Sequence, residues 1–217
     1  MLNKDQNYYH GIRWDLINFV SKGNNRILEI GCGDGNTGKA LKDQGKAVEV
    51  IGIEKVSEIA QIAETKIDKV IYANVETIEL PFSEGYFEYI IMGDVIEHLY
   101  DPWLLIRKLR PYLKKGGYIL ASIPNIRNWR VIKGLVFNGE WNYSHDGLLD
   151  DTHLRFFTKK TIVKLFSSED FRVHRLIPKF EFRPTYRSGI IKTVNYVTLG
   201  LLKGFLTFQY IIIAEKK

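Results

Sequence analysis

Short apolar runs rich in β-branched residues alternate with helix-like stretches along the first 123 residues. The runs occupy residues 26–30, 49–53, 69–72, 89–92 and 117–123. Runs of this length are typical of strands buried on both faces of a parallel sheet. Helices are predicted between them at 37–44, 56–65 and 102–113, the last starting at the capping pair Asp101-Pro102. The alternation predicts an α/β fold with a doubly wound, mostly parallel sheet.

The alternation stops after Ile123. Residues 124–158 are rich in Asn, Gly, Asp and aromatic residues, and a helix capped by Thr158 follows at 158–168. Loops of this length usually serve as lids or binding loops, so we predict a lid at 124–158. Strands are expected at 172–177 and 208–214. The apolar stretch 190–208 between them contains lysines and glycines, which favours an amphipathic helix on the core or on a membrane surface over a membrane span.

The length of 217 residues supports a single domain, because one sizeable core can form at this size. We divide it into an N-terminal helical cap at 1–25, a core at 26–123, the lid at 124–158 and a C-terminal part at 159–217 with a basic, apolar insertion. The single cysteine, Cys32, can form no internal disulfide, and the first 20 residues lack the pattern of a signal peptide. A cytoplasmic location is therefore expected.

The net charge of +6 is unevenly distributed. From Arg155 onward thirteen bases face four acids, a formal charge of +9, whereas the preceding residues sum to −3. A basic C-terminal face favours an anionic partner such as a phosphorylated small molecule, an acidic lipid surface or RNA. An ordinary solvated surface would give the same composition.

A glycine-rich segment, Glu29-Ile30-Gly31-Cys32-Gly33-Asp34-Gly35, follows the first predicted strand and precedes a helix. Glycine lets the chain turn sharply and lets a ligand approach the backbone near the helix amides. The acid expected about 20 residues beyond such a turn, for ribose hydroxyls, is present as Glu54. A nicotinamide oxidoreductase is the alternative, but its fingerprint requires glycine where Asn36 stands.

This segment and four later ones resemble the class I S-adenosylmethionine-dependent methyltransferases. The later segments are Gly52-Ile53-Glu54, Asn74-Val75-Glu76 ahead of Leu80-Pro81-Phe82, residues 87–91 and residues 113–117. Within that family the chain is similar to the branch that includes ubiquinone-biosynthesis O-methyltransferases and sugar- or polysaccharide-associated methyltransferases. The resemblance spans about residues 8–178. It implies a seven-stranded Rossmann-like sheet with one antiparallel strand, the last strand lying beside the fifth.

The resemblance also implies which residues bind S-adenosylmethionine. Those expected around its methionine part are Glu29, Gly31, Gly33 and Gly35, with Gly93 and Asp94 beside the sulfonium. Glu54 is expected at the ribose, and Asn74 with Val75 at the adenine. Many relatives have Asp at the position of Asn74, but an amide oxygen can also accept a hydrogen bond. Arg13 resembles an arginine that some relatives use on the cofactor carboxylate; an N-terminal helix docked on the core would place it equally well.

His98 and His153 are the candidate general bases, because each follows a predicted strand at the carboxyl edge of the sheet. Asp94, Glu97, His98 and His153 also resemble the four residues that hold a divalent ion in small-RNA 2′-O-methyltransferases, with Asp94 in place of a glutamate. Carboxylate and imidazole ligands suit magnesium, manganese or zinc. Alternatively, Glu97 and His98 orient a helix and His153 hydrogen-bonds within its loop.

The expected activity is O-methylation of a small or anionic acceptor, because two histidines can accept a hydroxyl proton. Two alternatives stay open: a metal-dependent RNA 2′-O-methyltransferase, and a cofactor-binding scaffold without catalysis. The expected partners are the acceptor and a membrane surface contacted peripherally, while nucleic acid is disfavoured.

Overall fold

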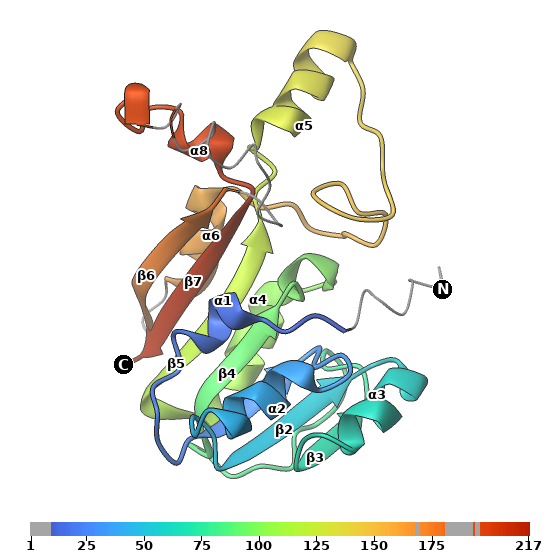
Figure 1. Cartoon of the computed structure of the whole chain (residues 1–217), viewed down its shortest axis with the longest axis vertical. Coiled ribbons are helices and arrows are strands. Elements are labelled where there is room, and N and C mark those ends of the chain that lie inside the picture. The colour runs from blue at the N-terminus through green and yellow to red at the C-terminus, as the bar shows by residue number, and fades with distance from the viewer. Residues whose placement is uncertain (1–9, 168–169, 181–192, 194–195) are drawn as a thin grey trace.

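Seven strands form one mixed sheet in the computed structural model, which describes residues 10–167, 170–180, 193 and 196–217 (Figure 1). The strands are β1 (Arg26–Ile30), β2 (Glu49–Glu54), β3 (Lys69–Tyr72), β4 (Phe87–Gly93), β5 (Leu113–Pro124), β6 (Phe171–Lys179) and β7 (Gln209–Lys216). Their order is β3-β2-β1-β4-β5-β7-β6. The first five pair in parallel, and β7 is antiparallel to both β5 and β6. The seven-stranded α/β sheet with its last strand beside the fifth is confirmed.

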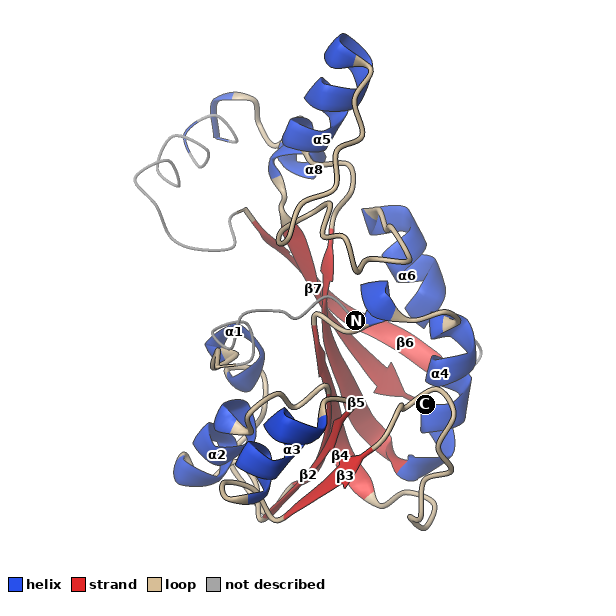
Figure 2. Ribbon diagram, turned by 90° about the vertical axis from the view of Figure 1, so that its right-hand side faces the viewer, coloured by secondary structure: helices blue, strands red, loops and turns tan. Residues whose placement is uncertain are grey.

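Helices cover both faces of the sheet. On one face lie α1 (Trp14–Ile17), α2 (Asn36–Asp43) and α3 (Ser57–Glu64), and on the other lie α4 (Pro102–Leu109) and α6 (Lys159–Phe166) (Figure 2). Neighbouring residues of β1 point to opposite faces, since Ile27 packs in the cluster with α1 and α2 while Leu28 packs in the cluster with α4 and α6. The two apolar cores fix the strand ends, where the candidate ligand-binding residues lie.

The two predicted helix caps, Asp101 and Thr158, are confirmed, but α4 ends earlier than expected. Asp101 Oδ1 accepts a hydrogen bond from the Leu104 amide at 2.8 Å, and Thr158 forms a capping box with Thr161. Helix α4 stops at Leu109 because Pro111 offers no amide hydrogen and its ring clashes with a regular helical turn. The chain passes through a 3₁₀ turn, η3 (Arg110–Tyr112), directly into β5.

The segment 124–158 contains helical structure that its composition did not predict. Helix α5 (Trp129–Lys133) continues into a π-helical turn, η4 (Gly134–Asn138), and the Asn128 side chain caps it by accepting from the Arg130 amide at 3.1 Å. Together with α8 (Lys203–Leu206), this unit stands beyond the sheet at the end of β5 and the start of β7 (Figures 1 and 2).

The helical cap expected at 1–25 is small in the described residues, where it consists of the four-residue α1. Leu16, Ile17 and Val20 are buried against the sheet. The amphipathic helix expected at 190–208 lies partly outside the described residues, and within 196–208 the α-helical part is α8. Among the described helices none is long and apolar enough to cross a bilayer.

Candidate active site

The loop between β1 and α2 requires glycine at three alternate positions. Gly31, Gly33 and Gly35 have φ of +66°, +53° and +80°, a backbone region that other residues rarely adopt. A Cβ on Gly31 would lie 2.8 Å from Val95 Cγ2, and one on Gly35 would lie 3.1 Å from the Cα of Ala63. The loop therefore packs tightly between α3 and the residues that follow β4, and side chains at Gly31 and Gly35 would collide with these neighbours.

Glu54 ends β2 and holds this loop. Its buried carboxylate accepts hydrogen bonds from the amides of Gly33 at 3.1 Å, Lys55 at 2.8 Å and Val56 at 3.0 Å. These bonds place a fixed negative charge beside the glycine loop, at the start of α3. The carboxylate lies at the strand end where the resemblance expects a partner for the ribose hydroxyls.

Asn74 and Val75 lie one strand further along the same edge. The Ala73 amide donates to the Glu54 carbonyl at 3.0 Å, which joins the ends of β3 and β2. Asn74 is exposed and its Oδ1 accepts from the Glu76 amide at 3.0 Å, whereas Val75 is buried in the core. The two residues are thus adjacent to Glu54, as adenine recognition would require.

Arg13 is the residue before α1, and its side chain extends across Gly93. Its Nη1 donates to Asp94 Oδ2 at 2.7 Å and its Nε donates to Asp15 Oδ1 at 3.0 Å. A Cβ on Gly93 would lie 2.7 Å from Nη1, so glycine makes room for the guanidinium. Burial works against the charged form, but Asp94, Asp15 and Glu97 outweigh it and raise the pKa of Arg13 above its ordinary value. The docking of α1 on the core is therefore seen in the structure, and it places the guanidinium beside Asp94. Contact of Arg13 with the cofactor carboxylate stays a prediction.

Asp94 has a positive φ of 57° immediately after β4, a conformation that the surrounding contacts maintain. Its Oδ1 accepts from Ser122 Oγ at 3.0 Å and from the Gln209 side-chain amide. Ser122 and Gln209 come from β5 and β7, and the sequence analysis missed both, as it missed Asp15. The sequence signal for Ser122 and Gln209 was a polar residue within an otherwise apolar strand.

Glu29 lies beneath the glycine loop and is fully buried. Its Oε2 has no hydrogen-bond partner among the described residues. Burial raises the pKa of Glu29 to about 8, with Arg13 opposing the shift. A buried carboxyl with one unpaired oxygen beside this loop suits a cationic group of a ligand, such as the ammonium of the methionine part of S-adenosylmethionine.

Replacing Glu29 should change how stability depends on pH. The folded pKa lies above the unfolded value of 4.5, so the folded state keeps a proton that the unfolded state releases, and the free energy of unfolding falls as pH rises from 4.5 to about 8. Glu29→Gln should remove this fall and be more stable than the parent at pH 8.5 by about 5 kcal/mol. Urea unfolding at pH 5 and pH 8.5 measures it; parallel curves for the two proteins would contradict a buried, protonated Glu29.

Glu97, His98 and His153 meet although 55 positions separate the two histidines. One ligand atom from each lies within 4.8 Å of the others, and the histidine ring centroids are 4.8 Å apart. Glu97 and His98 belong to a 3₁₀ turn after β4, η2 (Ile96–His98). The Glu97 carbonyl accepts from the amides of Leu154 at 2.8 Å and Arg155 at 3.0 Å, which ties the two segments together.

Asp94 does not join this cluster. The resemblance to metal-binding methyltransferases places it among the ligands, but its oxygens bind Arg13, Ser122 and Gln209 instead. Aspartate is one methylene shorter than the glutamate of those enzymes, and Arg13 competes for its charge. The set present in the described residues is therefore one carboxylate and two imidazoles.

Hydrogen bonds define the histidine tautomers. A carbonyl only accepts, so His153 Nδ1 donates to Leu148 O at 3.3 Å and His98 Nδ1 donates to Thr152 O at 3.1 Å. The neutral rings consequently carry their lone pairs on Nε2. Burial, followed by repulsion from His153, lowers the pKa of His98 to about 4, which leaves it neutral at physiological pH.

The Glu97 carboxyl is the most deeply buried group of the cluster. Its Oε1 lies 4.0 Å from His153 Nε2, and neither oxygen has a hydrogen-bond partner among the described residues. Burial, then repulsion from Asp94, raises its pKa well above the ordinary value. Buried polar atoms are normally paired, so these two oxygens point to a proton or cation that belongs in the cluster.

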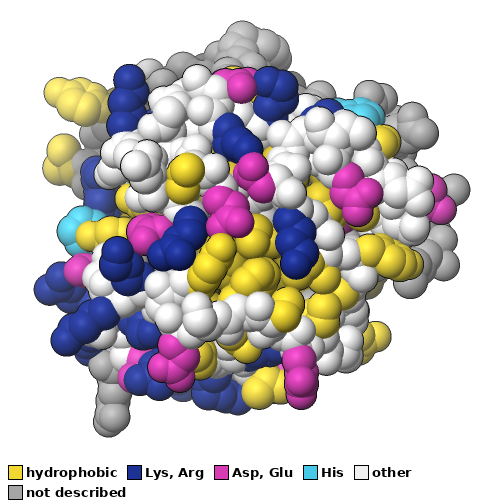
Figure 3. All heavy atoms as spheres, turned by 90° about the horizontal axis from the view of Figure 1, so that it is seen from below, with side chains coloured by type: hydrophobic (Ala, Val, Ile, Leu, Met, Phe, Trp, Pro, Cys, Tyr) yellow, Lys and Arg dark blue, Asp and Glu magenta, His cyan; other side chains and the backbone are white. Residues whose placement is uncertain are grey.

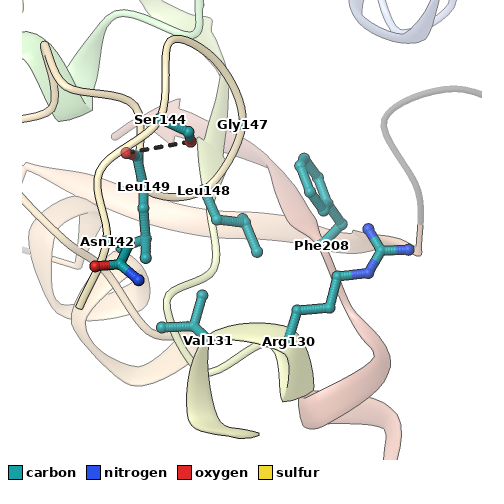
Figure 4. A pocket seen from close by; sticks show the side chains of 8 residues that line it. All are labelled: Arg130, Val131, Asn142, Ser144, Gly147, Leu148, Leu149 and Phe208. Carbon is teal, nitrogen blue, oxygen red and sulfur yellow. Dashed lines mark hydrogen bonds between the residues drawn. The ribbon is translucent and has the colours of Figure 1, made fainter. Parts of the chain in front are cut away.

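A cavity of about 280 Å³ lies between α5 and the loop at 139–150 (Figure 4). Apolar side chains of Val131, Leu148 and Phe208 line it together with Arg130. Leu148, which lines the cavity, also supplies the carbonyl bound by His153, so the cavity and His153 are linked through this one residue.

The family model for the methyltransferase domain matches residues 6–176, which is most of the chain. The chain belongs to the methyltransferase domain family. The match covers the glycine loop, Glu54 and the cluster of Glu97, His98 and His153. This family consists of class I S-adenosylmethionine-dependent methyltransferases, and the strand order of the chain is the one that the resemblance implied.

Relatives of this methyltransferase differ widely. An uncharacterized protein of Methanocaldococcus jannaschii is 35% identical over 50% of this chain and 48% of its own length. Demethylmenaquinone methyltransferase of Listeria welshimeri is 28% identical over 57% and 54%. The chain thus spans about half the length of these curated relatives. A SAM-dependent methyltransferase structure from Archaeoglobus fulgidus shares the fold, with a TM-score of 0.63 at 19% identity over 91% of this chain and 88% of that one.

Proposed function

We propose that the chain transfers the methyl group of S-adenosylmethionine to an oxygen atom of a small or anionic acceptor. One observation carries this proposal. Glu97, His98 and His153 lie together in a methyltransferase domain, after strands that end at the same edge of the sheet as the glycine loop. Methyl transfer from a sulfonium depends mainly on positioning the acceptor, but a hydroxyl acceptor must also lose its proton. The cluster supplies groups suited to that second requirement.

The residues present fit S-adenosylmethionine. The glycine loop exposes backbone, Glu54 offers a fixed carboxylate at the end of β2, and the unpaired Oε2 of Glu29 suits an ammonium. Arg13, above Gly93, could bind the cofactor carboxylate by exchanging part of its contact with Asp94. When bound, the cofactor would supply an electrophilic methyl group for the acceptor oxygen.

The chain's own groups would hold the acceptor hydroxyl and receive its proton. Both histidines carry the Nε2 lone pair in their neutral form, because their Nδ1 atoms donate to backbone carbonyls. The Nε2 of either ring can take the hydroxyl proton as the oxygen attacks the methyl carbon. Glu97 lies near enough to His153 to stabilise the imidazolium that forms.

The cavity linked to His153 through Leu148 supports a small acceptor with an apolar body and a negative group. Its volume is at the lower end of the range for small-molecule sites, and Arg130 is a donor that matches carboxylate or phosphate. The segment 124–158 forms much of the cavity wall. We therefore retain it as the proposed lid.

A divalent cation is the second candidate element of this site, favoured by the two unpaired oxygens of Glu97. Glu97, His98 and His153 would hold it, and their nitrogen and oxygen donors suit magnesium, manganese or zinc. Such an ion would lower the pKa of an acceptor hydroxyl.

The direct test follows labelled methyl from S-adenosylmethionine into phosphosugars, catechols and short RNAs, with and without a chelator. We expect transfer to an oxygen of a phosphosugar or catechol. Loss of that transfer in chelator, with recovery on adding magnesium, manganese or zinc, would support the cation, and indifference to chelator would remove it. Transfer to RNA alone would support the RNA alternative. Cofactor binding without transfer to any acceptor would support the non-catalytic scaffold. Transfer to RNA alone and absence of transfer would each contradict the proposal.

A further inference from the structure

The end of the molecule beyond β5 and β7 carries an exposed apolar surface. Its side chains, called here the apical surface, are Leu135, Val136, Phe137, Tyr196, Val197, Leu199 and Leu201. Phe137 is 80% exposed and Leu199 is 89% exposed, although both belong to the residue types that proteins usually bury. Groups of exposed apolar residues such as 135–137 and 196–201 are typical of sites of interaction.

The two segments that form the apical surface are joined at their base. Asn125 Nδ2 donates to the carbonyls of Gly204 at 2.9 Å and Thr207 at 2.7 Å, and Asn128 Nδ2 donates to Thr207 O at 3.0 Å. The Arg127 guanidinium lies 4.2 Å from the ring centroid of Phe205. Helix α5 and α8 therefore rise from one anchored base, and their apolar ends project from the same end of the molecule (Figures 1 and 2).

The charge around the apical surface is mostly positive. Residues 126–138 and 196–208 contain Arg127, Arg130, Lys133 and Lys203 and no acid, and the exposed Glu140 follows η4, where its amide donates to Gly134 O at 3.1 Å. The opposite end of the molecule differs, because there lysine and arginine side chains alternate with aspartate and glutamate (Figure 3). Arg127 lies against Phe205, where the two segments are joined, and Lys203 is the first residue of α8, whereas residues 135–137 belong to η4, which continues α5 away from the sheet (Figure 1).

We propose that the apical surface docks on a bilayer that contains anionic lipids. Apolar side chains at the outer ends would enter the region between headgroups and acyl chains, and the bases behind them would lie among the lipid phosphates. Both requirements for stable peripheral binding, apolar burial and a basic cluster, are met by the same two segments. RNA would use the bases but would leave Phe137 and Leu199 without a partner.

Docking would also bring the candidate active site to the membrane. Arg130 and Val131 of α5 line the cavity that is linked to His153 through Leu148. An amphipathic acceptor could then pass from the lipid surface to the cavity over a short path. Lipid binding itself requires no methyl transfer, so the two proposals can fail separately.

Flotation of the full chain with vesicles tests the docking surface. We expect binding to vesicles of phosphatidylcholine with 30% phosphatidylglycerol, little binding to phosphatidylcholine alone, and weaker binding in high salt. Phe137→Asp should lower the partition coefficient at least tenfold, and Lys133→Gln should lower it about fivefold, as expected for one base near an anionic surface. Val48→Asp, which adds the same charge at an exposed valine before β2, should change nothing.

Circular dichroism and S-adenosylmethionine binding should be the same in all three variants, which separates docking from folding. Absence of vesicle binding, or equal loss in Val48→Asp and Phe137→Asp, would overturn the proposal. Tight binding to a short RNA that Phe137→Asp leaves unchanged would assign the bases to nucleic acid instead, and would also overturn it.

Discussion

Replacing the member of the Glu97, His98 and His153 cluster that takes the acceptor's proton should abolish most of the methyl transfer while leaving cofactor binding intact. We compare His98→Ala, His153→Ala and Glu97→Gln. The variant that lacks the proton acceptor should show a kcat lower by roughly 10²- to 10⁴-fold, which is the usual contribution of a general base. A cation centre predicts strong loss in all three variants, because each removes a ligand. A simple base predicts strong loss in one histidine variant only. Single-turnover kinetics with the best acceptor measures the effect.

His145→Ala is the matched control for this series. His145 lies in the same segment, is largely exposed and contacts Asp151 rather than the cluster. Its replacement should leave kcat within about twofold of the parent, as surface substitutions usually do. Full activity in both histidine variants would leave positioning alone as the source of catalysis and would refute the assignment of a base.

Glu54→Ala should weaken binding of S-adenosylmethionine and of its demethylated product by roughly 10- to 150-fold, which corresponds to about 1.5–3 kcal/mol for hydrogen bonds to a charged group. The variant loses a ribose partner, and it also leaves the amides of Gly33, Lys55 and Val56 without their acceptor. Calorimetric titration measures the affinity. Glu64→Ala removes the same charge from an exposed position at the end of α3 and should bind normally. Unchanged affinity in Glu54→Ala would remove Glu54 from the cofactor site.

The fold was largely predictable because its strands are buried on both faces. Continuous apolar runs place β1 and β3 at their observed bounds, and the cap at Asp101 marks the start of α4. Periodicity carries no information on strand order, so the position of β7 beside β5 came from the family resemblance. Helix α5 was missed because five residues give too short a pattern, and much of its stability comes from packing of Val131 on Leu148 and Phe208.

The candidate site was predictable where a residue's role depends on local backbone. The glycines and Glu54 follow from a strand-to-helix turn, and His98 with His153 follow from their places at the carboxyl edge of the sheet. The contacts of Asp94 could not be foreseen, since Ser122 and Gln209 lie 28 and 115 positions away. The exclusion of Asp94 from the histidine cluster depends on those contacts and on Arg13, which only the tertiary structure brings together.

The most direct test of the account is calorimetric titration of the unmodified chain with S-adenosylmethionine, with NAD as the comparison. The glycine loop, Glu54 and Glu29 predict saturable binding of S-adenosylmethionine at one site and no binding of NAD. Saturable binding of NAD without binding of S-adenosylmethionine would contradict the account.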